Sequence, residues 1–200
     1  VQRHQQNAAP RLKVISKSGD ALLVALHGDQ ENIAIAEPYW RPATDSSVVA
    51  LVQSSRVSFS DAYVWDDVDR GAAELERHLA SLRERFNVPP ERTVMAGFSA
   101  GCGIILQAVL NGKVKVASLL LVAPWMPQLD EWSARLGMLK GTTVRIVVGD
   151  RDEDCLEGSK KLASLLDGVG VEHELRVIEG MEHDYPDDLR DDILAVLSEQ

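Results

Sequence analysis

Residues 92–101, with the sequence R-T-V-M-A-G-F-S-A-G, decide the fold of this chain. The stretch begins with apolar residues up to Ala96, which predict a buried strand. Small residues then surround Ser99, as a tight change of direction requires, in the form G-x-S-x-G. An apolar run resumes at once and ends near Asn111-Gly112, a typical helix C-cap. The stretch therefore predicts a strand, a sharp turn that pushes the Ser99 hydroxyl out of the sheet, and a helix.

Six further segments have the short apolar runs that are typical of strands. Two runs, at residues 48–52 and 118–122, are continuously apolar, which is the pattern of strands buried on both faces. The turn signal Ser18-Gly19-Asp20 separates the first two segments and predicts a hairpin between them. The six segments are residues 12–17, 21–26, 47–53, 116–122, 143–148 and 171–178.

Between these strands, apolar residues recur at spacings of three and four, which places them on one face of a helix. The pattern is clear in residues 68–86, 162–169 and 189–197. Alternating strands and helices predict an α/β fold, a three-layer α/β/α sandwich with a mostly parallel sheet of about seven strands. Ligands of such folds bind beyond the C-terminal ends of the strands, so functional residues are expected directly after them.

A serine, carboxylates and a histidine follow successive predicted strands, in that chain order. Ser99 follows residues 92–96, Asp150 and Asp152 come directly after a later strand, and His183 comes after the last one. A serine hydroxyl is a weak nucleophile at neutral pH and needs a neighbouring base. A carboxylate can then orient that base and stabilise its charged form. The order therefore indicates a site for acyl transfer to Ser99.

His183 is the best candidate for the base, because it lies on a glycine-containing loop from which it can reach Ser99. The other four histidines suit structural roles. His4 lies in the tail, His27 in a loop, His78 in a predicted helix and His173 in a predicted strand. The residues alone leave the acid open among Asp150, Asp152 and Asp154. All three lie after one strand, and an acidic side chain there can also be a helix cap.

Composition limits the classes of function. The chain has 200 residues, which fits a single domain at residues 11–200 after a polar tail at residues 1–10. Its formal charge of −10 argues against a nucleic-acid partner. Its apolar runs are shorter than the ~20 residues of a transmembrane helix, and the tail has no apolar leader core. Cys102 and Cys155 lack zinc or redox spacing, so we expect free thiols, a cytoplasmic protein, and no metal or cofactor.

Four segments together resemble the carboxylesterase and acyl-protein thioesterase branch of the α/β-hydrolases. They are L-H-G-D at 26–29, G-F-S-A-G at 97–101, V-G-D-R-D at 148–152 and G-M-E-H at 180–183. The resemblance runs from Leu22 to the C-terminus and implies the α/β-hydrolase fold. It implies that the acid is Asp152 of G-x-x-D and that the base is His183 of G-x-x-H. It also implies an oxyanion hole formed by the backbone N–H groups of Asp29 and Ala100.

The resemblance implies hydrolysis of a carboxylic ester or thioester through an acyl-enzyme, with a small-molecule or acylated substrate and no cofactor. A peptidase, an amidase or another acyl transferase on this fold is one alternative, since a triad does not specify its leaving group. A non-catalytic binding protein is another. The loop H-G-D-Q-E-N at 27–32 departs from the glycine-rich family version, because it places an acidic side chain at Asp29.

The segment at residues 124–139 is too short for a large lid domain. We expect its Trp125 and Met126 either to form a small apolar wall over the acyl site or simply to pack the fold. The family resemblance implies that Trp65 lies near the acyl pocket, and a packed tryptophan before a capped helix is an equal interpretation of Trp65. An open site favours small esters, or substrates carried on larger molecules, over long triglycerides. The sequence leaves the oligomeric state open, with a homodimer among the candidates.

Overall fold

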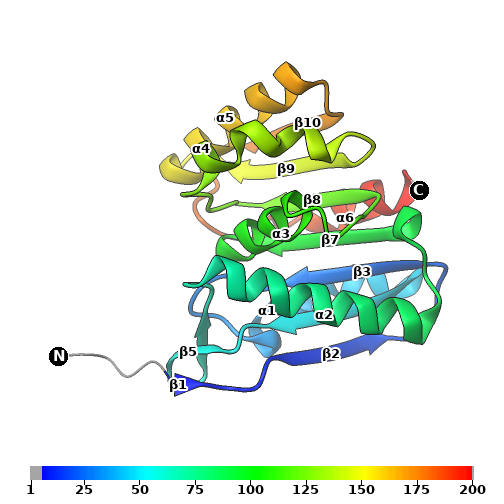
Figure 1. Ribbon diagram of the computed structural model, residues 1–200. Helices are drawn as coiled ribbons and strands as arrows, with labels where there is room; N and C mark the ends of the chain where they lie inside the picture. The colour runs from blue at the N-terminus through cyan, green and yellow to red at the C-terminus, as the bar shows by residue number, and fades with distance from the viewer. Residues whose placement is uncertain (1–5, 200) are drawn as a thin grey trace.

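The computed structural model describes residues 6–199, so the first half of the predicted polar tail, with His4, lies outside it. A seven-stranded sheet forms the centre, in the order β10-β9-β8-β7-β3-β4-β2 (Figure 1). All neighbouring strands are parallel except β2 and β4, which are antiparallel. The strands are β2 (Arg11–Ser16), β3 (Ala21–Leu26), β4 (Ser47–Gln53), β7 (Thr93–Phe98), β8 (Ser118–Val122), β9 (Thr143–Gly149) and β10 (His173–Ile178).

Helices cover both faces of the sheet, which confirms the predicted three-layer α/β arrangement (Figure 1). One face carries α2 (Val68–Phe86), α3 (Ala100–Leu110) and α5 (Glu153–Val169), and the other carries α1 (Ile33–Trp40) and α6 (Leu189–Ser198). Each strand supplies both apolar cores because successive side chains point to opposite faces. In β3, Leu22 and Val24 enter the first core and Leu23 enters the second.

The sequence located all seven strands of the sheet, with ends displaced by no more than two residues. It found only the C-terminal half of α5, and it missed α1, which lacks an amphipathic pattern and contains Pro38. It also missed a small second sheet in the order β1-β5-β6. These strands are β1 (Gln6–Asn7), β5 (Arg56–Phe59) and β6 (Ala62–Val64).

The predicted hairpin between residues 12–17 and 21–26 is wrong. Strand β2 pairs with β4, while β3 lies between β4 and β7 and is parallel to both. The turn between β2 and β3 instead passes over the start of β4. Gly19 has a φ of 130°, and a Cβ there would lie 2.3 Å from the backbone oxygen of Ser46. The turn signal at residues 18–20 thus predicted correctly that the chain reverses there. It did not predict that β2 pairs with β4.

Between β8 and β9 the chain forms only α4 (Leu129–Trp132) and a 3₁₀ segment, η3 (Ser133–Leu139). Trp132 and Leu136 are buried against the core on the α3 side of the sheet. This short segment packs the fold in the way expected of a chain without a large lid. None of the helices in the described part combines the length and the hydropathy that crossing a bilayer requires.

Candidate active site

Ser99 lies on a strained turn between β7 and α3. Its φ of 51° and ψ of −123° are unfavourable for a residue with a Cβ, and such conformations cost about 1–3 kcal/mol. The surrounding backbone holds the turn in place. The N–H of Ser99 donates to Val122 O at 2.9 Å, and its carbonyl accepts from the N–H groups of Cys102 and Trp125, both at 3.1 Å.

The turn requires small residues because neighbouring parts of the chain approach its backbone closely. A Cβ at Gly101 would lie 2.6 Å from the carbonyl oxygen of His27, and one at Gly97 would lie 2.9 Å from Cδ1 of Ile105. Side chains at these positions would push α3 away from the ends of β3 and β7. The glycines of the G-x-S-x-G segment therefore let the start of α3 sit directly behind Ser99.

Hydrogen bonds connect the serine, the histidine and one aspartate. Nε2 of His183 lies 2.8 Å from Oγ of Ser99, and Nδ1 of His183 lies 2.6 Å from Oδ2 of Asp152. The three residues come from the ends of β7, β9 and β10, as expected for residues that follow parallel strands. Asp152 is 8% exposed, whereas the His183 side chain is 43% exposed, so the imidazole faces solvent and the carboxylate does not.

Asp150 has a different contact from Asp152. Its Oδ1 accepts a hydrogen bond of 2.7 Å from the N–H of Gly180, at the start of the loop that carries His183. The backbone N–H of Arg151 donates to Met181 O in the same loop. Asp150 thus holds the two loops together, while Asp152 lies against the imidazole. Asp154 is exposed in the first turn of α5 and borders the pocket at Ser99.

Two backbone N–H groups beside Ser99 are available to an oxyanion. Ala100 is the first residue of α3, and the first N–H groups of a helix have no partner within it. The N–H of Asp29 donates to no residue of the described chain. Asp29 and Ala100 both border the pocket that contains Ser99 and His183. The positions named by the family resemblance therefore lie together.

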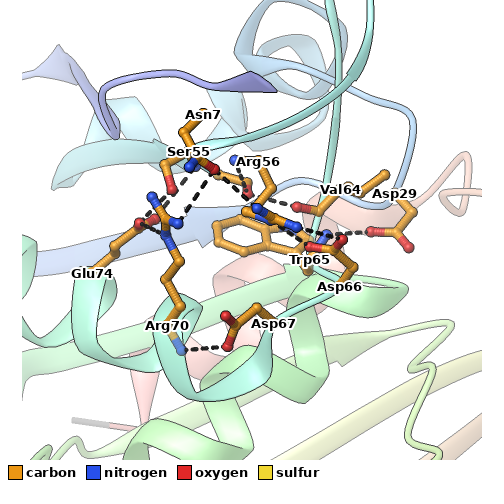
Figure 2. Close-up of polar contacts among 11 residues, drawn as sticks. Asn7, Asp29, Ser55, Arg56, Val64, Trp65, Asp66, Asp67, Arg70 and Glu74 are labelled. Atoms are coloured by element: carbon orange, nitrogen blue, oxygen red, sulfur yellow. Dashed lines mark hydrogen bonds and ion pairs between the residues drawn. The ribbon is translucent and has the colours of Figure 1, made fainter. Parts of the chain in front are cut away.

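The acidic side chain of Asp29 is held by the Trp65 segment (Figure 2). Its Oδ1 accepts from the backbone N–H of Trp65 at 2.7 Å, while Nε1 of Trp65 donates to His27 O at 2.8 Å. Trp65 thus bridges the two residues on either side of Gly28. Burial raises the pKa of Asp29, and the Trp65 N–H partly opposes that rise. Only the backbone of Asp29 is needed by an oxyanion, so its acidic side chain is compatible with that site.

Ion pairs and a helix cap anchor the Trp65 segment (Figure 2). Arg56 pairs with Asp66 at 2.9 Å, and Arg70 pairs with the buried Glu74 at 3.1 Å. Asp67 caps α2 by accepting from the N–H of Arg70. The structural interpretation of this segment, a packed tryptophan before a capped helix, therefore agrees with the structure. Trp65 also borders a pocket.

His27 and Glu31 support the loop around Gly28. Nδ1 of His27 lies 2.6 Å from Gly28 O, and its Nε2 accepts from the N–H of Ser54, so the proton is on Nδ1. Burial lowers the pKa of His27 to about 4, which keeps the ring neutral. Glu31 accepts from the N–H of Gly28 at 2.7 Å and from the hydroxyl of Tyr185 at 3.1 Å. The sequence predicted the structural role of His27 but missed Glu31.

Aromatic rings pack behind the catalytic histidine candidate. Phe98 lies with its centroid 5.0 Å from that of His183 and 4.1 Å from that of Tyr185. Tyr185 stacks in turn on Tyr39 of α1 at 3.8 Å. This stack limits the orientations open to the imidazole. Sequence reasoning missed Tyr185 and Tyr39, because no local pattern links residues so far apart in the chain.

Two pockets meet beside Ser99. One, of about 300 Å³, contains Ser99 and His183, and the other, of about 230 Å³, extends from it toward Trp65. Trp125 borders both pockets and is 43% exposed. Of the three predicted pocket residues, Trp65 and Trp125 are therefore placed at pockets. Met126 is 7% exposed, packs in the apolar core and borders neither of the two.

The two cysteines are buried free thiols, as predicted. Cys102 is in the core of α3, where its Sγ lies 3.6 Å from Val122 O. Cys155 lies in the first turn of α5, with Sγ 3.6 Å from Nδ1 of His183. Burial, reinforced by the carboxylate of Asp152, raises the pKa of Cys155 to about 12, so it is a thiol at neutral pH.

Comparisons with known proteins concern the family and the fold of the chain. An uncharacterized protein from Bacillus cereus ATCC 10987 is 38% identical, with a TM-score of 0.85 over 93% of this chain; the chain spans 61% of that protein. Carboxylesterases from Mesorhizobium loti and Bacillus cereus are each 19% identical, with TM-scores of 0.74 and 0.77. Each aligns with 97% of this chain, which spans 98% and 96% of them, and at this identity the likeness concerns the fold.

No curated protein matches the chain by sequence. The phospholipase/carboxylesterase family matches residues 2–199, which is almost the whole length. The same residues contain the parallel sheet, the strained serine turn and the strand-end histidine. The chain therefore belongs to the phospholipase/carboxylesterase family of the α/β-hydrolase fold.

Proposed function

We propose that this chain is a serine hydrolase that cleaves carboxylic esters and thioesters through an acyl-enzyme on Ser99. The observation that carries the proposal is the hydrogen-bonded series from Asp152 through His183 to Ser99, with distances of 2.6 Å and 2.8 Å. In this series each ring nitrogen of one imidazole has its own partner. That arrangement is what a base needs in order to take a proton at Nε2 while Nδ1–H stays oriented.

In the first step, Oγ of Ser99 attacks the carbonyl carbon of the substrate while Nε2 of His183 takes the hydroxyl proton. The oxygen of the tetrahedral intermediate accepts hydrogen bonds from the N–H groups of Asp29 and Ala100. These donors are fixed before the reaction by the turn at Ser99 and by the contacts of Trp65, so they need no reorganisation. His183 then gives its proton to the leaving alcohol or thiol.

In the second step, Nε2 of His183 takes a proton from water, and the resulting hydroxide attacks the acyl carbon. The tetrahedral intermediate uses the same two N–H groups. Its collapse returns the proton to Ser99 and releases the carboxylic acid. Asp152 holds the ring in the Nδ1–H form and stabilises the imidazolium in both steps. The contact between Asp150 and the N–H of Gly180 gives Asp150 a structural role in the same site.

Hydrolysis of p-nitrophenyl acetate and butyrate by purified variants tests the proposal. Ser99→Ala should lower kcat/KM by more than about 1000-fold, because the nucleophile is lost. A fluorophosphonate probe should label the wild-type chain and not this variant. Comparable turnover and labelling in the two proteins would refute Ser99 as the nucleophile.

Two aspartate variants form a matched pair for the acid. Asp152→Asn should lower kcat by about 10⁴-fold, because an amide favours the wrong tautomer of His183. Asp150→Asn keeps an acceptor oxygen for the N–H of Gly180, so its loss should be far smaller. Equal losses in the two variants would contradict the assignment. Amide substrates in the same assay establish whether the leaving group must be an alcohol or a thiol.

A further inference from the structure

Cys155 adds a sulfur atom to the pair formed by Asp152 and His183. Its Sγ lies 3.6 Å from Nδ1 of His183, which in turn lies 2.6 Å from Oδ2 of Asp152. The ligand atoms of the three side chains all lie within 4.8 Å of one another, and residues 6–199 contain one such group of His, Cys, Asp or Glu. The sequence predicted no metal cluster, because Cys155 and His183 are far apart in the chain.

We propose that Asp152, Cys155 and His183 form an inhibitory site for a thiophilic divalent cation such as Zn²⁺. Imidazole nitrogen, thiolate sulfur and carboxylate oxygen are the usual ligands of Zn²⁺. Mg²⁺ and Ca²⁺ prefer oxygen ligands alone and would not be held here. The effect on turnover rests on the proposed hydrolase function, whereas binding of the cation does not.

One of the ligand separations already suits a tetrahedral ion. Zinc–nitrogen and zinc–sulfur bonds of about 2.0–2.3 Å place nitrogen and sulfur about 3.6 Å apart around a tetrahedral centre. The separation between Nδ1 and Sγ is already 3.6 Å. The nitrogen–oxygen separation must widen from 2.6 Å to about 3.4 Å by the same reasoning, so binding requires the Asp152 carboxylate to move away from the ring.

The local fold explains why the three side chains meet. Asp152 is the residue before α5 and Cys155 lies three positions further on, in the first turn, so both point to one side of the helix start. The loop after β10 brings His183 to the same side. All three side chains border the open pocket of about 300 Å³ at Ser99, which gives a small ion a path to them from solvent.

Metal binding at Nδ1 is incompatible with catalysis because a neutral imidazole carries one proton. In the catalytic form that proton is on Nδ1, and the lone pair of Nε2 accepts from Ser99. An ion on Nδ1 requires the other tautomer, in which the proton is on Nε2. Cys155 releases its thiol proton to solvent and bonds as a thiolate. Nε2 then has no lone pair for the serine proton, so acylation stops until the ion leaves.

The test uses the full chain, freed of metal with EDTA that is then removed. Hydrolysis of p-nitrophenyl acetate is measured over a Zn²⁺ series in the wild type, in Cys155→Ala and in Cys102→Ala. Each rate is divided by the metal-free rate of the same protein, so a change in basal activity cancels. Zn²⁺ should inhibit the wild type and EDTA should restore the rate. Cys155→Ala should need at least about tenfold more Zn²⁺ for half-inhibition, and Cys102→Ala should behave as the wild type.

Binding has its own readout in Cd²⁺, whose bond to a thiolate gives an ultraviolet charge-transfer band. The wild type and Cys102→Ala should develop this band with one equivalent of Cd²⁺, and Cys155→Ala should not. Equal half-inhibiting concentrations of Zn²⁺ in the wild type and Cys155→Ala, or no band in the wild type, would overturn the site. A band in a wild-type chain that hydrolyses no ester would refute the proposed function and leave the cation site standing.

Discussion

His27 and His183 show how two histidines near one serine differ at the scale of single residues. His27 is 1% exposed, and backbone groups of Gly28 and Ser54 occupy both of its ring nitrogens. His183 has an exposed ring whose Nε2 faces a hydroxyl. The first ring therefore shapes a loop, while the second is open to solvent and to Ser99, as the base of the proposed reaction must be.

The neutral state of His27 predicts a dependence of stability on pH. Its pKa is 6.5 when unfolded and about 4 when folded, so the unfolded chain binds more protons between these values. Stability is therefore fully present above pH 6.5 and falls as pH drops, by about 3 kcal/mol at pH 4 from this residue. Urea unfolding of the wild type and His27→Gln measures it. The stability advantage of the wild type should shrink as pH falls from 7 to 4, and a constant difference would contradict the prediction.

Single residues also show where prediction from sequence ends. The closeness of Ser99 and His183 could be predicted because each lies in a segment that follows a strand, and strand ends meet at one edge of a parallel sheet. The acid could not be chosen from the residues, because the choice depends on which carboxylate the loop turns toward the ring. Asp150 accepts from the N–H of Gly180, whereas Asp152 contacts the ring. Tyr185 bonds to Glu31 across 154 positions, a contact that no periodicity encodes.

At the scale of elements, the loops after β9 and β10 position two of the three catalytic candidates. The backbones of the two loops are in contact. The N–H of Arg151 donates to Met181 O, and Gly149 packs closely against the same carbonyl oxygen. Asp152 and His183 therefore depend on the separation between two loops. The sequence predicted both strands but not this contact, because it depends on how closely two backbones approach.

Gly149→Ala tests this contact. Its Cβ would lie 2.0 Å from Met181 O, which is backbone, so one loop must move. We expect kcat/KM for p-nitrophenyl butyrate to fall about 100-fold, because a displacement of about 1 Å at reacting groups has that effect. Gly168→Ala in α5 is the control. Nothing lies within 4 Å of its Cβ, so activity should persist and stability should rise by up to about 1 kcal/mol. Full activity of Gly149→Ala would show that the loops adapt freely.

At the scale of the whole molecule, the parallel sheet brings segments that are distant in the chain together at one edge. The order of its strands was the feature that the sequence predicted least well. Continuous apolar runs predicted buried parallel strands correctly, but β2 and β3 did not form a hairpin. Strand β3 is parallel to neighbours on both sides, and β2 pairs with β4 instead. Partner choice of this kind follows from packing both faces, which a local turn signal does not report.

A buried carboxylate attaches helix α6 to the sheet. We expect the loss of its ion pairs to lower the free energy of unfolding of the whole chain. Asp192 is 1% exposed and pairs with Arg145 of β9 at 2.8 Å and with Arg176 of β10. Asp192→Asn leaves both guanidinium groups without a buried negative partner, so the free energy of unfolding should fall by about 3 kcal/mol.

Urea denaturation measures this loss as a lower midpoint with an unchanged slope, because the fold buries the same surface. Asp191→Asn, on the exposed side of α6, removes the same charge and should change stability by no more than about 0.5 kcal/mol. The pair of variants separates the buried contact from a simple change in net charge. Equal midpoints for the two variants would show that α6 is held by its apolar residues alone.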